Sequence, residues 1–378
     1  MKKIIALLLS LACLVSLISC KRKTKYEPVE STEEENTTVM TLTIGEDTYE
    51  VKYELYRMFF LNYKSMVDGG NAEVWNGAEK EKYIAEIDKI IISRITEIYS
   101  AFAVCKSIGF DLYSKEVDEK IEENIKISVE GGSYGNKTIE GYGSYENYLA
   151  SLKSMNMNYA VMILLFRYAI AIDAIDSHYI GTVSSDDVDI NMTIGAISYT
   201  RDDVKAFYDS DDCVRVLSAT FQTAIATDPE KKAESIKEKL LTAAASKNAP
   251  TDKETAVFLA IMNNSALSGG EEVRRGKLIG RYNLDRAYYG EMTDAAFALE
   301  PYAVSDGIRI VTDVEDSYYI LYRADKSDTH FNDNYESIKY IYLTNYVGKI
   351  LHDTALTLTE SVQYTDFLKS VNHTVIGM

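Results

Sequence analysis

Few residues in this sequence have the type and spacing that covalent or metal chemistry requires. Asp187, Asp189 and Asn191 match the first ligands of a calcium-binding loop, but methionine and serine replace the glycine and glutamate that the loop also needs. The glycine-rich stretch 131–143 is not followed by the Gly-Lys-Ser/Thr that completes a phosphate-binding loop. No hydrolase, metal or nucleotide motif is present. The sequence therefore favours a binding protein and predicts no cofactor and no metal site.

Side chains that commonly act as nucleophiles or general bases are also scarce. The histidines lie at 178, 330, 352 and 373, all outside the core of the α+β domain that we predict for residues 213–326. Cys13 and Cys20 belong to the N-terminal leader, whereas Cys105 and Cys213 fall in segments that we assign to different domains. We therefore expect two buried free thiols rather than a disulfide.

Residues 1–20 have the pattern of an export leader, with two lysines, an apolar run and a small residue before Cys20. Their ending, Leu-Ile-Ser-Cys, resembles the bacterial lipobox, in which the cysteine is lipidated and becomes the new N-terminus. The resemblance implies an extracytoplasmic lipoprotein whose Cys20 carries acyl chains such as palmitate. Two such chains anchor a protein stably in the lipid bilayer of the cell membrane or outer membrane. An ordinary leader with a chance cysteine is the alternative.

The charge of the chain restricts its partners. The full chain has a net charge of −18, and without residues 1–19, which carry two lysines and no acids, the charge is −20. This excess argues against nucleic acid as a partner and favours a soluble body above an anionic surface. Residues 21–38 are polar and rich in glutamate and threonine, so we expect a disordered tether there.

Hydrophobic periodicity predicts a helical first half. A hairpin around Gly45 is expected over 39–52, followed by a helix from Tyr53 that ends at Gly69-Gly70. The strongest helical stripe runs to Gly109, which is expected to end that helix, and Ser114 is expected to cap the next one. Further helices are predicted at 145–152 and 157–178, the latter too charged to cross a membrane. The stripe consists of Ile84, Ile87, Ile91, Ile95, Ile98, Phe102 and Cys105.

The second half has a different pattern. A strand is expected over 214–223, helices over 228–245, 253–262 and 292–299, a β-rich stretch over 308–323, and a long helix over 332–351. This order predicts an α+β fold in which helices come first, a compact α+β insert follows, and a last helix returns to the first group.

Several motifs together resemble the extracytoplasmic parvulin-type foldases, the PrsA and SurA group of peptidyl-prolyl isomerases (rotamases) and chaperones. Val51-Lys-Tyr-Glu-Leu-Tyr56 is similar to the family's opening, and Gly109-Phe110 followed by Ser114-Lys-Glu-Val117 resembles its helix joint. Residues 203–210 are like the helix before the isomerase domain, and 290–299 look like a shortened Gly-x-Met…Ala-Ala-Phe-x-Leu segment. The resemblance implies a SurA-like helical chaperone domain (39–200 plus the C-terminal helix of 327–378) with an inserted parvulin-like domain (213–326).

The inserted domain departs from the family pattern at its catalytic positions. Ser218 and Tyr319 stand where the family has its two histidines, and a Glu-Phe-Glu segment after the methionine is missing. Met292 and Phe297 are the candidates for an apolar wall around a proline ring. These four residues are our candidate catalytic set. The alternative is that they are core residues of a degenerate parvulin domain with weak or lost isomerase activity.

The first helix carries more aromatic residues than one buried face requires. Tyr53, Tyr56, Phe59, Phe60 and Tyr63 are therefore candidates for a peptide-binding surface for unfolded or newly exported polypeptides. We weigh three functions: a membrane-tethered chaperone, an active prolyl isomerase, and a solute-binding lipoprotein. The third predicts βαβ units, which the helical first half does not favour.

Overall fold

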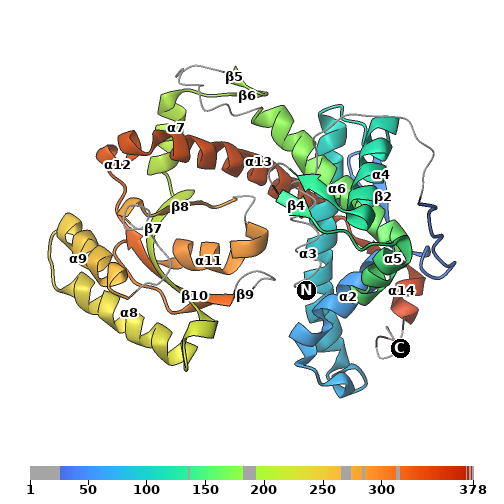
Figure 1. Ribbon diagram of the computed structural model, residues 1–378, viewed down its shortest axis with the longest axis horizontal. Coiled ribbons are helices and arrows are strands. Elements are labelled where there is room, and N and C mark those ends of the chain that lie inside the picture. The colour runs from blue at the N-terminus through green and yellow to red at the C-terminus, as the bar shows by residue number, and fades with distance from the viewer. Residues whose placement is uncertain are drawn as a thin grey trace. The chain divides into compact units, whose positions relative to one another are not determined.

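The computed structural model describes residues 26–134, 137–181, 193–264, 274–282, 286–311, 316–371, 373 and 376. Two compact units divide the chain: unit 1 contains residues up to 175 and from 350 onward, and unit 2 contains 176–349. Helices α6 (Tyr159–Tyr179) and α13 (Tyr335–Glu360) each span a boundary between the units (Figure 1). The predicted leader and Cys20 lie outside the described residues, as does the first half of the calcium-like stretch, residues 187–192; its second half, residues 193–198, is described.

Unit 1 combines a small antiparallel sheet with a helical body. Strand β1 pairs with β2 on one side and with β11 on the other. The turn between β1 and β2 needs Gly45, whose φ of 60° lies in the left-handed region, and the predicted hairpin is confirmed. The elements of unit 1, besides most of α6 and the end of α13, are β1 (Thr38–Ile44), β2 (Asp47–Lys52), α2 (Tyr53–Asp68), η1 (Ala72–Trp75), α3 (Lys80–Ser107), α4 (Lys115–Glu130), β3 (Gly132–Tyr134), β4 (Lys137–Ile139), α5 (Tyr145–Ser154), β11 (Gln363–Tyr364) and α14 (Asp366–Ser370).

Helix α3 has the buried stripe and the ends that the sequence predicts. The stripe from Ile87 to Cys105 is buried, and only Ile84 at its start is partly exposed. Gly109 has a φ of 78°, and the amide of Phe110 donates to the carbonyl of Cys105, as expected for a helix that ends in a glycine turn. Ser114 then caps α4 by accepting a hydrogen bond from the Val117 amide.

The stretch expected to be a disordered tether is described from Tyr26 onward, and there it packs on unit 1. Tyr26 is 8% exposed and donates a 2.6 Å hydrogen bond to the Glu130 carboxylate. Its ring lies 5.2 Å from that of Tyr145, whose hydroxyl donates to the carbonyl of Glu27. Tyr26 thus helps to hold this part of the chain on unit 1, because its ring is buried and its hydroxyl has a partner. Ser31 adds a hydrogen bond to the Glu54 carboxylate.

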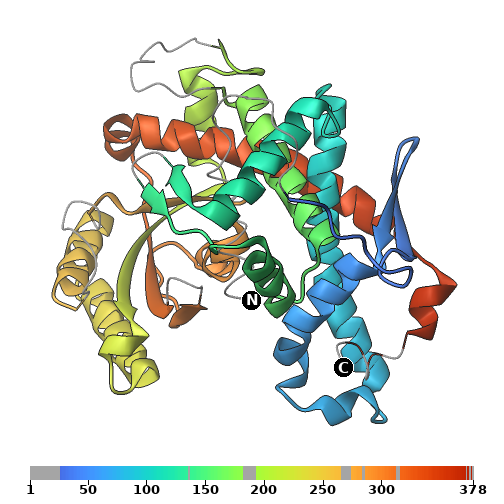
Figure 2. The same cartoon turned by 45° about the vertical axis from the view of Figure 1, so that its right-hand side comes forward.

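Unit 2 is built on a four-stranded antiparallel sheet with the order β8-β7-β10-β9. Helices α8 and α9 cover one face and α11 covers the other (Figures 1 and 2). Its elements are β5 (Thr193–Ile194), β6 (Ile197–Ser198), α7 (Arg201–Asp209), β7 (Cys213–Gln222), η2 (Thr223–Ile225), α8 (Pro229–Ala245), α9 (Pro250–Met262), β8 (Lys277–Gly280), α11 (Arg286–Ala298), β9 (Ile308–Val311), β10 (Asp316–Ala324), α12 (Asp328–Asp333), the end of α6 and the first part of α13.

The burial of β7 on both faces explains why its sequence is almost continuously apolar. Because helices cover both faces of the sheet, its alternate side chains are buried on opposite sides. Leu217, Ala219 and Phe221 face α8 and α9, whereas Val214 and Val216 face α11. The predicted α+β fold class is confirmed, and the strand pairs among the described residues are all antiparallel.

The boundaries of the two units differ from those expected from the sequence. Helix α12 lies in segment 327–378, which was predicted to return to the helical domain, and α7 lies between the predicted domains 39–200 and 213–326. Both helices belong to unit 2. Hydrogen bonds explain why both helices belong to unit 2. The Tyr208 hydroxyl of α7 is hydrogen-bonded to His330 of α12, and His330 is hydrogen-bonded to the carbonyl of Arg275 beside the sheet. Within the described part of the chain, no helix is both long and apolar enough to cross a membrane.

Candidate functional site

The four candidate catalytic residues lie toward one face of the sheet in unit 2. Tyr319 of β10 pairs with Thr220 of β7, and Leu321 pairs with Ser218. Because directly opposite residues of an antiparallel pair share a face, Ser218 and Tyr319 are near neighbours on the same side of the sheet. That side is the one covered by α11.

Helix α11 supplies the two apolar candidates. Met292 belongs to the buried cluster between α11 and the sheet and is only 1% exposed. Phe297 and Tyr319 are half-buried and pack at the edge of the same cluster. The sequence therefore identified residues that the fold brings together, although they are as many as 101 positions apart in the chain.

An arginine covers the candidate apolar wall. The guanidinium carbon of Arg281 lies 4.3 Å from the centre of the Phe297 ring. The same guanidinium is held by Asp212, at 3.0 Å between Nε and Oδ1, and by the carbonyl of Asp211 at 2.9 Å. One side of the Phe297 ring is thus occupied by a cation that has other partners of its own.

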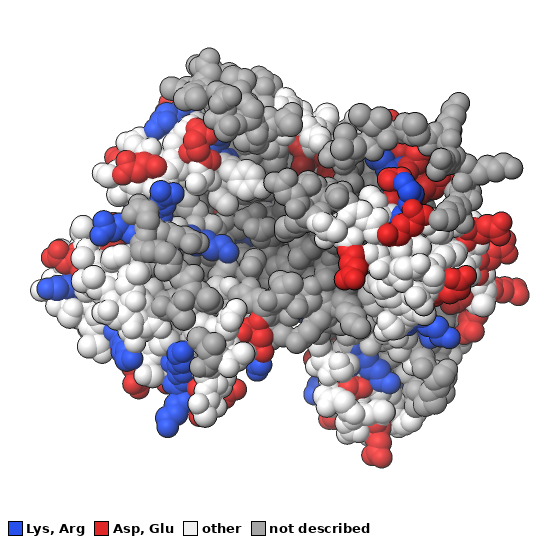
Figure 3. Space-filling model, in the orientation of Figure 1, with Lys and Arg blue, Asp and Glu red and all other residues white. Residues whose placement is uncertain are grey.

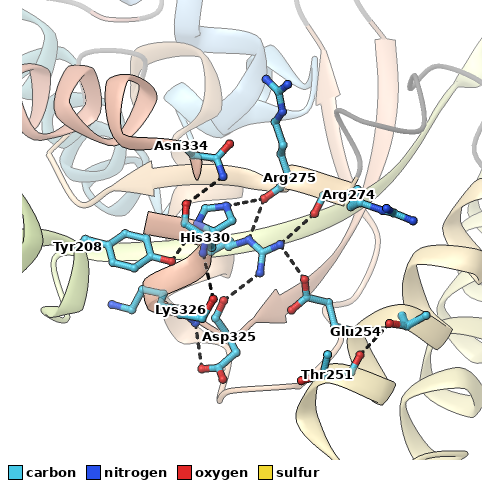
Figure 4. Close-up of polar contacts among 12 residues, drawn as sticks. Tyr208, Thr251, Glu254, Arg274, Arg275, Asp325, Lys326, His330 and Asn334 are labelled. Carbon is cyan, nitrogen blue, oxygen red and sulfur yellow. Dashed lines mark hydrogen bonds and ion pairs between the residues drawn. The ribbon is translucent and has the colours of Figure 1, made fainter. Parts of the chain in front are cut away.

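A buried polar cluster next to this sheet was not found by sequence reasoning. The guanidinium of Arg215, 5% exposed, donates to the carbonyls of Arg274, Arg275 and Asp325 and to the Glu254 carboxylate at 2.7 Å. One side chain on β7 therefore joins the segment before β8, the end of β10 and helix α9. Figure 4 labels its partners Glu254, Arg274, Arg275 and Asp325. An arginine in a strand carries no local signal of such a role, because every partner is distant in sequence.

His330 extends this cluster to α7 (Figure 4). Its Nε2 lies 2.8 Å from the carbonyl oxygen of Arg275, and its Nδ1 lies 2.9 Å from the Tyr208 hydroxyl. A carbonyl oxygen can only accept, so Nε2 carries the proton and Nδ1 accepts from Tyr208. The sequence placed His330 outside the core of the inserted domain, but the residue is 9% exposed and bonded to it.

The electrostatics of this cluster suit a structural role. Burial and the nearby Arg215 cation lower the pKa of His330 to about 4, which keeps the ring neutral near neutral pH. Burial also lowers the pKa of Lys326, whose Nζ donates to the carbonyls of Ser210 and Cys213. A neutral imidazole with both nitrogens hydrogen-bonded has no free position for proton transfer to a ligand.

A second surface of unit 2 consists of partly exposed aromatic rings, which we call the aromatic strip. Tyr335, Tyr342 and Tyr346 follow one another at intervals of seven and four residues, and they therefore share one face of α13. The ring centre of Phe207 on α7 lies 5.6 Å from that of Tyr342, and the ring centre of Tyr179 on α6 lies 6.2 Å from that of Tyr346. These five residues define the strip. Four are half-buried, and Tyr346 is 45% exposed.

The aromatic residues predicted to bind peptides on α2 are mostly core residues, which corrects that interpretation. Tyr56 and Phe60 have no exposed surface, and Tyr53 and Phe59 are each 6% exposed. Tyr56 donates a hydrogen bond to Asp88, and burial beside that carboxyl raises its pKa. Tyr63 is half-buried and accepts a hydrogen bond from Arg94. The surplus of rings arises because α2 packs against several partners at once, including η1, α3 and the C-terminal residues.

Metal and thiol chemistry have no geometric support in the residues that the structure describes. No group of three or more His, Cys, Asp or Glu side chains there could hold a metal ion. Cys105 and Cys213 are buried, unpaired thiols, and burial raises the pKa of each to about 12. Both thiols are therefore protonated and unreactive at neutral pH.

Comparison with known proteins identifies structural neighbours only. No family model and no curated protein matches the chain. Among solved structures, the foldase protein PrsA of Streptococcus pneumoniae is 18% identical over 83% of this chain and 92% of that chain, with a TM-score of 0.25. PrsA of Bacillus subtilis is 13% identical over 74% and 87%, with a TM-score of 0.23. The foldase protein PrsA of Lactococcus lactis is 14% identical over 90% and 100%, with a TM-score of 0.21. At these TM-scores the likeness carries no argument about the function of this chain.

Proposed function

We propose that this chain is an extracytoplasmic, membrane-anchored chaperone for newly exported polypeptides, with weak or lost prolyl isomerase activity. The observation that supports the chaperone role is the aromatic strip of unit 2. A row of half-exposed Tyr and Phe rings offers apolar area together with hydroxyl groups, which suits extended polypeptides of many sequences. Unfolded clients expose the apolar side chains that such a surface binds.

The closed state of the α11 face supports weak or lost isomerase activity. Prolyl isomerisation requires a catalyst to lower a rotation barrier of about 18–20 kcal/mol, with an apolar pocket for the ring and a polar frame for the twisted carbonyl. Met292 is 1% exposed and Arg281 lies over one side of Phe297, so little of the candidate apolar wall is open to a proline ring. Ser218 and Tyr319 supply hydroxyl groups but no imidazole.

The membrane anchor rests on the sequence of the leader. The likeness of Leu17-Ile-Ser-Cys20 to a lipobox supports acylation of Cys20 as the source of membrane affinity. Each buried methylene contributes about 0.8 kcal/mol, and two chains are needed for stable attachment.

Two assays on the purified full chain test the proposal. The chain should slow the light-scattering increase of a denatured client diluted from urea. It should leave the isomerisation of a proline tetrapeptide close to its uncatalysed time of roughly tens to hundreds of seconds. If the chain neither protects the client from aggregation nor catalyses isomerisation, a scaffold role is favoured. Arg281→Ala, which uncovers Phe297, should strengthen proline-peptide binding.

An active prolyl isomerase is the second candidate, because the four candidate residues do share one face of the sheet. A strong rate enhancement that disappears in Met292→Ala or Tyr319→Ala would establish this function instead. Asp366→Ala in unit 1, where the aspartate is fully exposed, is a suitable control.

A further inference from the structure

The charged side chains beside the aromatic strip differ in whether they already have a partner within the protein. Asp203 lies one helical turn before Phe207 on α7, and the ring centres of Phe207 and Tyr342 are 5.6 Å apart. Burial and, after it, the charge of Asp203 raise the pKa of Tyr342. Hydrogen bonds from the hydroxyl and amide of Thr200 lower the pKa of Asp203 itself, so this carboxylate stays charged. Asp202 beside it and Asp333 at the end of α12 are exposed, and neither has an ion-pair partner among the described residues. Figure 3 shows Asp and Glu side chains, with Lys and Arg side chains among them, at the surface near α7 and α12.

The cations of the same elements are already engaged. Arg201 lies 4.2 Å over the Tyr335 ring and donates to Asn332. Lys205 bridges Asp209 at 2.5 Å and Asp328 at 3.0 Å. Lys339 has a side chain only 6% exposed and is paired with Glu336 at 2.5 Å. The charge that remains available to a ligand on α7 and α12 is therefore negative.

The rings and the carboxylates favour one kind of ligand. Tyrosine faces attract ammonium and guanidinium groups, and exposed carboxylates attract the same groups over a Debye length. An acidic segment would meet repulsion from Asp202, Asp203 and Asp333 at the place where its apolar side chains contact the rings. The surface thus selects by charge as well as by apolarity.

We infer that the aromatic strip, with Asp202, Asp203 and Asp333 beside it, is the docking surface for unfolded polypeptide segments that combine basic and apolar side chains. This inference rests on the proposed chaperone function and specifies its client class. Lysine or arginine side chains of the client lie over Tyr342 and Tyr346 or pair with the three carboxylates, and the aliphatic side chains between them cover the remaining ring surface.

The test uses the full chain and two labelled, unstructured peptides of about fifteen residues. They have the same leucine and serine positions, and one carries lysine where the other carries glutamate. Fluorescence anisotropy should show roughly tenfold tighter binding of the basic peptide at low salt. The difference should largely vanish near 1 M salt, where the Debye length is about 3 Å.

Matched variants assign the binding to this surface. Tyr346→Ala should weaken binding of the basic peptide several-fold, whereas Tyr340→Ala should not, because Tyr340 is 53% exposed on another side of the same helix. The double variant Asp202→Asn/Asp333→Asn should abolish the preference for the basic peptide. Its control, Glu81→Gln/Glu116→Gln, removes the same charge from sites in unit 1 that are 81% and 82% exposed and should keep the preference.

The outcomes distinguish the inference about basic clients from the proposed chaperone function. Equal binding of both peptides, or an unchanged preference in the Asp202/Asp333 double variant, overturns the basic-client inference and leaves the chaperone function standing. No binding of either peptide together with no protection from aggregation contradicts the proposed function itself. If the chain dimerises and Tyr346→Ala makes it monomeric, the strip is covered by a second copy, and the inference is wrong.

Discussion

The Tyr208 hydroxyl lies 2.9 Å from Nδ1 of His330, and the two rings are stacked with 13° between their planes. Because Nε2 donates to the carbonyl of Arg275, Nδ1 is the acceptor of this bond. Protonation of His330 would force the Tyr208 hydroxyl to turn from donor to acceptor and would place a second cation near Arg215 in a buried site. The joint between α7, α12 and the sheet is therefore more stable with a neutral histidine.

The stability of unit 2 should depend on pH through His330. Its folded-state pKa of about 4 lies below the ordinary value of 6.5, so the unfolded chain binds the proton more tightly. The contribution is complete above pH 6.5 and is lost as the pH falls toward 4, with a slope approaching about 1.4 kcal/mol per pH unit. Urea unfolding at several pH values should show this slope in the wild type. His330→Gln should show a smaller one, and parallel curves for the two proteins would contradict the assignment.

Removing the buried arginine of the same cluster should destabilise unit 2 strongly. Arg215→Met leaves the Glu254 carboxylate and three carbonyl groups without their donor, and losing one partner of a buried pair typically costs about 3–5 kcal/mol. Arg309→Met is the control, because its ion pair with Asp316 is half-exposed and contributes under about 1 kcal/mol. The urea midpoints of the two variants measure the difference, and similar midpoints would argue against the bridging role of Arg215.

A methyl group at Gly348 should loosen the contact between α13 and the end of β8. A Cβ there would overlap the carbonyl oxygen of Tyr282. Alanine has the higher helix propensity by about 1 kcal/mol, but overpacking against rigid backbone costs about 1–3 kcal/mol and should win. Gly348→Ala should therefore lower the thermal midpoint and speed amide exchange in 277–282. Gly77→Ala, whose Cβ would make only ordinary contacts, should do neither.

Membrane attachment should depend on one cysteine. Cys20→Ala removes the acylation site, so the protein should leave the membrane fraction, whereas Cys13→Ala within the leader should remain attached. Cell fractionation followed by a high-salt wash measures the distribution. A Cys20→Ala protein that still sediments with membranes after the wash is incompatible with a lipid anchor.

The sequence by itself determined the features that depend on near neighbours. The hairpin at Gly45, the end of α3 at Gly109 and the Ser114 cap each depend on contacts within a few residues, where spacing and glycine conformation decide the outcome. The α+β class and the buried stripe of α3 followed from periodicity. The motifs of the inserted domain also selected Ser218, Met292, Phe297 and Tyr319, which the strand register brings to one face.

Only the tertiary structure decided which of these residues remain available to a ligand. The α2 rings look surplus in the sequence but are buried, because η1, α3 and the C-terminal residues pack against them. Arg281 covers Phe297 from 16 positions away, and Arg215 and His330 join partners from 39 to 122 positions apart. The sequence pattern records that a side chain is apolar or charged. Burial and pairing depend on distant segments that meet only when the chain folds. Those contacts decided that Arg281 covers Phe297 and that the aromatic strip stays partly exposed.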